Sequence, residues 1–162
     1  MIDWQQISLE DLAGYISEKL RQKGIDVILV GGGCVTIYSN NRYQSYDLDF
    51  VTYEDMSKVR KVLMGEGFKE KNRYFKHHKC PYIIEFVTPP VAIGKDPIHH
   101  FERIKTKLGT IKLLRLEDSV KDRLASFFTG TIERDLNKLW ISVLREKLIS
   151  MKLKSGQIMR VI

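Results

Sequence analysis

The chain has 162 residues, enough for one domain with a helical appendage and too few for two full-sized domains. Hydrophobic residues make up 43% of it, which excludes a chain that is disordered throughout. The formal net charge is +7. Residues 1–99 hold 13 basic and 13 acidic side chains, whereas residues 100–162 hold 14 and 7. We therefore expect any surface that attracts polyanions to come from the C-terminal third.

The cysteines and the N-terminus indicate the compartment. Cys34 and Cys80 stand alone, which fits neither a disulfide framework nor a zinc ribbon. The opening segment MIDWQQISLEDL carries acids where a signal peptide needs positive charge, and no apolar run approaches ~18 residues. These features predict a cytoplasmic protein without a membrane segment.

The first part of the chain predicts a helix, a strand and a second helix. Ser8 has the spacing of a helix cap, and the apolar residues after it recur every three or four positions up to Gly24. Residues 26–30 are apolar and rich in β-branched side chains, and they lead directly into three glycines. This pattern is typical of a buried strand that ends in a tight turn, and we expect residues 34–38 to form a helix after it.

The middle of the sequence predicts a second group of strands. Residues 46–52 alternate between two faces, and residues 55–66 carry apolar side chains at helical spacing. Residues 74–76 and 82–87 predict a hairpin with a longer loop. Residues 104–114 alternate around a glycine and predict one or two edge strands with lysines facing solvent.

The C-terminal third is helical in pattern. A helix is predicted from residue 116, with Asp118 placed to cap it, and a second helix over 132–148. The sequence thus predicts two parts, a core over residues 1–115 and a C-terminal helical segment over 116–162 that packs on the core.

Three carboxylates form the candidate reactive site. Asp47 and Asp49 lie two residues apart in a predicted strand, so their side chains leave the same face about 6 to 7 Å apart. Two like charges that close repel each other unless a cation lies between them. Glu85 is the only acid in an apolar hexamer, where an unpaired acid is costly. Together these residues predict a site for two Mg²⁺ ions, suited to phosphoryl or nucleotidyl transfer.

The glycine turn supplies a complementary feature. Gly31 and Gly32 stand between the predicted strand and helix, where backbone N–H groups and the helix N-terminus favour a phosphate chain. The third glycine, Gly33, leaves the register of this turn ambiguous by one residue.

The string VGGGCVTIYSNNRYQSYDLDFV resembles the nucleotidyltransferase superfamily of the DNA polymerase β type. That family has a Gly-Gly or Gly-Ser turn, a D-x-D strand about a dozen residues later, and a third carboxylate on an adjacent strand. The form R-Y-x-S-x-D-L-D, from Arg42 to Asp49, is similar to the small prokaryotic branch related to abortive-infection and toxin–antitoxin nucleotidyltransferases. PPVAIGKDPI and LEDSVKDRLASFF also resemble segments of that branch. The resemblance covers about residues 25–128.

The resemblance implies an α/β (α+β) fold of the polymerase-β type, with a small mixed, twisted sheet, flanking helices and a C-terminal helical segment. It implies two Mg²⁺ ions held by Asp47, Asp49 and Glu85, and an NTP such as ATP as substrate. The nucleotide-binding residues that it implies are Gly31, Gly32, Arg42, Ser45 and Lys121.

The implied reaction moves NMP from the NTP to a hydroxyl of a protein or RNA. The implied setting is a toxin–antitoxin system with a HEPN-type toxin as partner, and it allows an oligomer. A different class of function is an antitoxin-like binding module that docks a protein or RNA with weak or no catalysis. Modification of a small molecule is a third possibility that the sequence leaves open.

Most of these residues also have a purely structural interpretation. Asp47 and Asp49 could form the solvated face of an edge strand, and Glu85 could pair with a lysine or an arginine. Arg42 fits a loop arginine, and Lys121 fits a lysine that keeps its ammonium in solvent.

Overall fold

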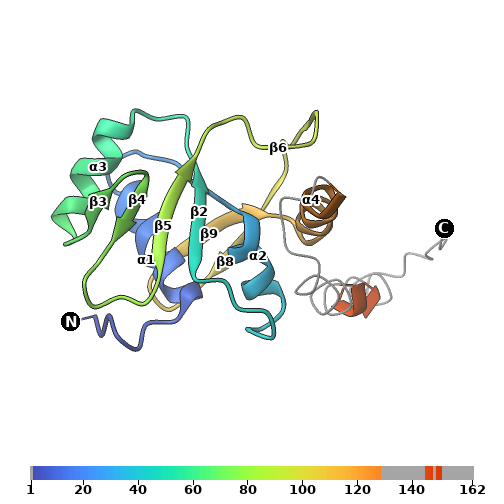
Figure 1. The fold of residues 1–162 in the computed structure, drawn as a ribbon, viewed down its shortest axis with the longest axis horizontal. Coiled ribbons are helices and arrows are strands. Elements are labelled where there is room, and N and C mark those ends of the chain that lie inside the picture. Colours follow the sequence, from blue (N-terminus) through green and yellow to red (C-terminus); the bar gives the residue numbers. More distant parts are fainter. Residues whose placement is uncertain (1, 129–144, 148, 151–162) are drawn as a thin grey trace.

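The computed structural model describes residues 2–128, 145–147 and 149–150 (Figure 1). A seven-stranded mixed sheet has the strand order β3-β4-β5-β2-β1-β9-β8, and β6 and β7 form a separate two-stranded ribbon. The helices are α1 (Leu9–Arg21), α2 (Gly31–Tyr38), α3 (Met56–Gly65) and α4 (Leu116–Phe128). The strands are β1 (Ile28–Val30), β2 (Asp47–Val51), β3 (Lys69–Lys71), β4 (Tyr74–Lys76), β5 (Ile83–Val87), β6 (Ala92–Ile93), β7 (Asp96–Pro97), β8 (Phe101–Lys105) and β9 (Thr110–Leu114).

The mixed sheet with flanking helices matches the fold class that the sequence predicts. Figure 1 shows α1 behind the sheet, α3 on the β3 side, and α4 beyond α2 on the other side. Within the described part of the chain, no helix combines the length and the apolar character needed to cross a bilayer.

Helix α1 begins where the sequence predicts. The Ser8 hydroxyl accepts a hydrogen bond from the Asp11 backbone N–H at 3.0 Å and so satisfies a first-turn donor. Leu12, Ile16 and Leu20 recur along the buried face of the helix and have no exposed area. The amphipathic pattern therefore places α1 against the sheet, where it packs on β9.

Strand β2 lies at the centre of the sheet and has two unlike faces. It pairs antiparallel with β1 and parallel with β5. Leu48 and Phe50 are fully buried on one face, where the Phe50 and Phe86 rings stack at 5.9 Å. The alternation that the sequence predicts is confirmed, and it leaves Asp47 and Asp49 together on the opposite face.

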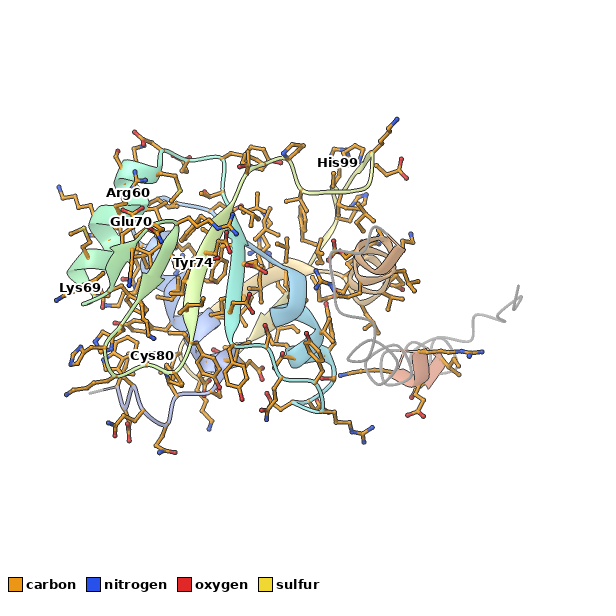
Figure 2. The ribbon with its side chains drawn as sticks, viewed as in Figure 1. Arg60, Lys69, Glu70, Tyr74, Cys80 and His99 are labelled. Atoms are coloured by element: carbon orange, nitrogen blue, oxygen red, sulfur yellow. The ribbon has the colours of Figure 1, made fainter. Side chains whose placement is uncertain are left out.

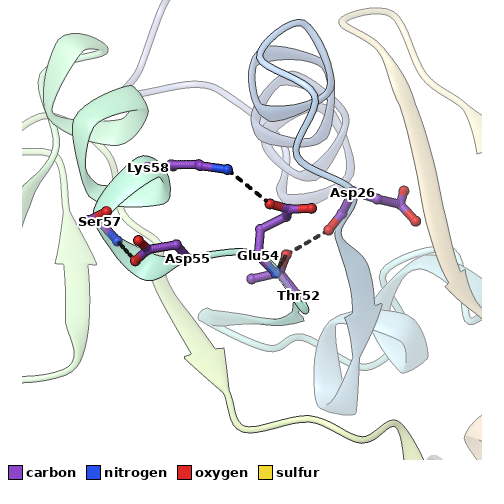
Figure 3. A network of polar contacts seen from close by, with 6 residues as sticks. All are labelled: Asp26, Thr52, Glu54, Asp55, Ser57 and Lys58. Atoms are coloured by element: carbon purple, nitrogen blue, oxygen red, sulfur yellow. Dashed lines mark hydrogen bonds and ion pairs between the residues drawn. The ribbon is translucent and has the colours of Figure 1, made fainter.

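The far end of β2 leads into α3 through a polar network (Figure 3). The Thr52 hydroxyl donates to the Asp26 carbonyl at 2.8 Å, which ties this end of β2 to the segment before β1. The Asp55 carboxylate accepts from the Ser57 N–H at 2.8 Å and caps α3. Of the two aspartates of the candidate site, Asp47 begins the strand at the opposite end and Asp49 lies at its middle.

Some strands differ from the sequence-based expectation. The hairpin of β4 and β5 is confirmed, but β3 adds a further strand to its edge, with Lys69, Glu70 and Lys71 all exposed. The segment around Gly109 does form two strands, yet only β8 is an edge. Strand β9 lies inside the sheet between β1 and β8, because Leu113 pairs in parallel with Leu29.

The C-terminal part is described only in pieces. Helix α4 begins at Leu116, so Asp118 lies in its first turn and does not cap it; instead its buried carboxylate accepts from Arg115 at 3.0 Å. The helix predicted over 132–148 lies mostly outside the described residues, although 145–147 are helical. The Lys147 ammonium donates to the Tyr38 carbonyl, so this piece contacts α2. The division of the chain at residue 116 stays a prediction.

Candidate active site at the head of strand β2

The strand registers align a row of side chains across the sheet. Val30 on β1 lies opposite Asp49 on β2, Asp49 lies opposite Glu85 on β5, and Glu85 lies opposite Tyr74 on β4. Tyr74 marks one end of this row in Figure 2. Asp47 is on the same face, two residues earlier in β2. The sheet therefore brings the three predicted carboxylates onto one surface.

Ser45 positions the first carboxylate. Its hydroxyl donates to Asp47 Oδ1 at 2.5 Å, and its backbone N–H donates to the Thr36 hydroxyl of α2 at 2.9 Å. Ser45 is buried. This side chain thus links α2 to the start of β2 and restricts the orientation of Asp47.

Asp49 carries unneutralised negative charge. Burial, and after it the charges of Asp47 and Glu85, raise its pKa from 3.8 to about 7. The positive charge of Arg123 on α4 lowers the pKa of Asp49, but it only partly offsets these effects. A carboxylate in this state gains from any cation that binds beside it.

Glu85 has a cationic partner in this structure. The Arg73 Nε atom lies 2.7 Å from Glu85 Oε1, and the side chain of Glu85 is 12% exposed while that of Arg73 is 72% exposed. The sequence left open a lysine or arginine partner for Glu85, and Arg73 is that partner. The third carboxylate is therefore close to the aspartate pair but bound to a guanidinium.

The first two glycines of α2 make room for the acidic residues. Gly31 has a φ of +69°, and a Cβ atom there would lie 2.5 Å from Asp49 Oδ2. At Gly32 the added atom would lie 3.0 Å from the Ser45 hydroxyl oxygen. Gly33 instead faces the core side chain of Leu48 at 3.3 Å. Gly31 and Gly32 thus face Asp49 and Ser45, and Gly33 faces the core.

The first turn of α2 has no side-chain cap. Val30 is its cap residue and provides no side-chain hydrogen bond to the first turn. The positive end of the helix dipole lies at this turn. The phosphate-binding role of Gly31 and Gly32 stays a prediction, because the observed function of their missing side chains is to let Asp49 and Ser45 approach the backbone.

The two predicted basic contacts lie at the periphery. Arg42 is exposed in the loop before β2, and its side chain has no contact with the three carboxylates in the described part of the chain. Lys121 on α4 is also exposed, and its ammonium lies 3.9 Å from the buried Asp118 carboxylate. Their roles toward a nucleotide stay predictions.

Two arginines in or beside the site were missed from the sequence. Arg123 Nη2 donates to Asp122 at 2.8 Å, and both charges act on Asp49. Arg73 sits in the turn between β3 and β4. The amphipathic pattern of α4 gives no reason to single out Arg123, and Arg73 follows a strand that the sequence does not predict.

A hollow of about 550 Å³ lies away from this row, between α1 and α3, and contains none of the carboxylates. Its lysines include Lys19, which pairs with Glu66 at 3.1 Å, and Lys58, which pairs with Glu54 at 3.4 Å. The site is therefore defined by the carboxylate row rather than by this hollow.

The donor set fits a divalent cation. Carboxylate oxygens are the ligands that hard cations such as Mg²⁺ prefer, and Asp47 and Glu85 add negative charge beside the buried carboxylate of Asp49. Among the described residues, no three acidic, histidine or cysteine side chains already surround a common metal position. Asp47 and Asp49 are thus the available ligands, and Glu85 is engaged by Arg73.

No protein-family model and no curated protein matches the sequence. Solved structures do match the fold. An antigenic nucleotidyltransferase-like protein from Paracoccidioides brasiliensis has a TM-score of 0.64 at 14% identity, over 91% of this chain and 88% of that protein.

Two structures of the antibiotic-resistance factor ANT(2'')-Ia are also similar. The solution structure has a TM-score of 0.55 at 11% identity, over 96% of this chain and 91% of that one. The crystal structure in complex with adenylyl-2''-tobramycin has a TM-score of 0.54 at 11% identity, over 87% and 88%. At these identities the likeness concerns the fold alone. The chain therefore has the fold of nucleotidyltransferase-like proteins.

Proposed function

We propose that this protein is a Mg²⁺-dependent nucleotidyltransferase that moves NMP from an NTP to an acceptor hydroxyl and releases pyrophosphate. The observation that carries the proposal is the position of Asp49. Its carboxylate has a pKa of about 7, neighbours two other acids, and lies beside Gly31 at the N-terminus of α2, whose first turn has no side-chain cap. A cation would bind the acidic side chains there, and a phosphate chain would bind beside them at the positive end of the α2 dipole. The fold of the structural neighbours supports the same function.

The acidic residues would hold the cations. Asp47 and Asp49 bind them directly, and Ser45 keeps Asp47 in its orientation through the 2.5 Å hydrogen bond. Bound divalent ions lower the pKa of an attacking hydroxyl and neutralise a departing pyrophosphate. Glu85 lies next to Asp49 across the sheet and completes the ligand set when it leaves Arg73.

The chain would bind the triphosphate at the start of α2. Backbone N–H groups of Gly31 and Gly32 donate to phosphate oxygens, and the helix dipole favours their charge. Lys121 adds positive charge there. Its ammonium is exposed, and its ion pair with Asp118 is long, at 3.9 Å.

The acceptor is proposed to be a hydroxyl of a protein or of RNA. The excess of seven positive charges beyond residue 99 suits an acidic acceptor. The R-Y-x-S-x-D-L-D motif supports a toxin–antitoxin setting with a HEPN-type partner. A small-molecule acceptor is the second candidate, because one structural neighbour was solved with an adenylylated aminoglycoside.

Pyrophosphate release tests the proposal. The protein is incubated with Mg²⁺, each of the four NTPs, and RNA, protein or aminoglycoside acceptors. We expect release with at least one combination, and loss of at least ~100-fold in Asp47→Asn. Asp96→Asn, on the exposed β7, is the matched control and should retain full activity. An antitoxin-like module would instead bind its partner without any release, and full activity in Asp47→Asn would show that the metal role is wrong.

A further inference from the structure

We propose that Arg73 is a resident counter-ion that a divalent cation displaces from Glu85, and that the freed guanidinium then binds the phosphates of the nucleotide. The inference rests on the proposed function, since it concerns the same site. It makes Arg73 a nucleotide-binding residue that also regulates metal binding.

The ion pair consists of one fixed and one movable partner. Glu85 projects from the middle of β5 and is 12% exposed, so its position is set by the sheet. Arg73 is 72% exposed and lies in the two-residue turn between β3 and β4, where Asn72 has a φ of +58°. The guanidinium can therefore turn away while the strand pairing stays intact.

Arg73 has one short polar contact and two looser ones. Its ion pair with Glu85 is 2.7 Å long. The Tyr74 hydroxyl accepts from Nη2 at 3.4 Å, which is long for a hydrogen bond, and the Tyr74 ring centroid lies 5.4 Å from the guanidinium carbon, within cation–π range. The ion pair with Glu85 is therefore the shortest contact that holds the guanidinium over the carboxylate row, and Tyr74 can remain its neighbour when that pair opens.

A divalent cation would compete for the same carboxylate. Glu85 lies directly opposite Asp49 in the paired strands, so a cation at the aspartate pair lies within reach of Glu85. A bound cation would also repel the guanidinium. Ion pairs with one exposed partner are weak. Arg73 should therefore lower the affinity of the carboxylate site for the divalent cation by only about two- to fivefold.

The displaced guanidinium can bind the phosphates of the nucleotide instead of Glu85. Its planar set of N–H donors matches phosphate oxygens, and the phosphates would lie between the first turn of α2 and the carboxylate row. One side chain thus opposes the metal and assists the nucleotide. Removing it should have opposite effects on the two affinities, which loss of a purely structural contact would not produce.

Calorimetric titration distinguishes these effects. Mg²⁺ alone is titrated into the wild type, Arg73→Gln and Arg60→Gln, and a nonhydrolysable ATP analogue is then titrated at saturating Mg²⁺. Arg60 is the matched control, because it pairs with Glu70 at 2.8 Å on the outer edge of the sheet (Figure 2). Arg73→Gln should bind Mg²⁺ about two- to fivefold more tightly and the analogue at least ~5-fold more weakly. Arg60→Gln should match the wild type.

Further outcomes separate this inference from the proposed function. Arg73→Lys keeps the charge and loses the planar donors, so its Mg²⁺ affinity should stay near that of the wild type while its nucleotide affinity falls. If Arg73→Gln does not fold, Arg73→Lys still tests whether Arg73 binds the nucleotide. Unchanged or weaker Mg²⁺ binding in Arg73→Gln would overturn the role of Arg73 alone. A wild type that binds no Mg²⁺ would overturn the proposed function itself.

Discussion

Replacing Asp49 with asparagine should stabilise the fold while it abolishes the reaction. The pKa of Asp49 rises from 3.8 to about 7 on folding, a change of about three pH units. Each unit corresponds to about 1.4 kcal/mol, so the ionised carboxylate costs the folded state up to about 4 kcal/mol. Allowing for relaxation around the charge, we expect Asp49→Asn to gain about 2 to 3 kcal/mol at pH 8.

The gain should depend on pH with a defined sign. Between about pH 4 and pH 7 the folded chain keeps the proton on Asp49, whereas the unfolded chain has lost it. The stability of the wild type therefore falls as the pH rises through this window, through the contribution of this group. At pH 4 the folded state is protonated and the unfolded state is still partly protonated, so little of this loss has accumulated and Asp49→Asn should be close to neutral there.

Thermal unfolding in EDTA at pH 4, 6 and 8 measures this effect. A gain of 2 to 3 kcal/mol corresponds to a rise in Tm of about 5 to 10 °C for a chain of this size. Asp96→Asn, on an exposed strand, should shift Tm by less than ~2 °C at every pH. Added Mg²⁺ should raise the Tm of the wild type at pH 8 and leave that of Asp49→Asn nearly unchanged. A variant less stable than the wild type at pH 8, or a gain independent of pH, would refute the reasoning.

Three further substitutions test the surroundings of the site. Gly31→Ala should cost at least ~3 kcal/mol of stability in urea unfolding and abolish transfer, because it adds a steric clash to an unfavourable φ. Its control, Gly94→Ala, has a φ of +61° but no neighbouring atoms, and should cost only about 1 kcal/mol. Equal costs at the two glycines would contradict the packing argument. Ser45→Ala should lower the transfer rate about 10-fold at low Mg²⁺ by freeing Asp47, and an unchanged rate would remove its positioning role. Tyr38→Phe should cost about 1 kcal/mol in urea unfolding, since its hydroxyl donates at 2.7 Å to a carbonyl at the end of β9; a neutral result would mean that water replaces the bond.

The residue pattern predicted the local features of the site well. The alternation of Leu48 and Phe50 with the two aspartates follows from a strand with one buried face, and the structure shows that arrangement. The pattern predicts a glycine turn before a helix over residues 34–38, but α2 begins at Gly31, so the three glycines form the first turn of the helix itself. These features depend on residues close in sequence, where periodicity and turn chemistry are informative.

The long-range features were beyond such patterns. Asp49 and Glu85 meet because β2 and β5 pair in parallel, and neither strand's alternation states its partner or register. Strand β9 alternates as an edge strand would, yet it pairs with β1 inside the sheet. Strand β3 reads Lys-Glu-Lys and has no apolar signal, so the turn that carries Arg73 could not be placed.

Label transfer from NTPs labelled at different phosphates tests the central claim most directly. The protein is incubated with Mg²⁺, acceptor, and each NTP carrying radiolabel in either the α or the γ phosphate. We predict that the acceptor gains label only from the α phosphate, with release of pyrophosphate, and gains none with Asp49→Asn. Label from the γ phosphate, or α-label transfer that Asp49→Asn leaves intact, would contradict a nucleotidyltransferase built on the aspartate pair.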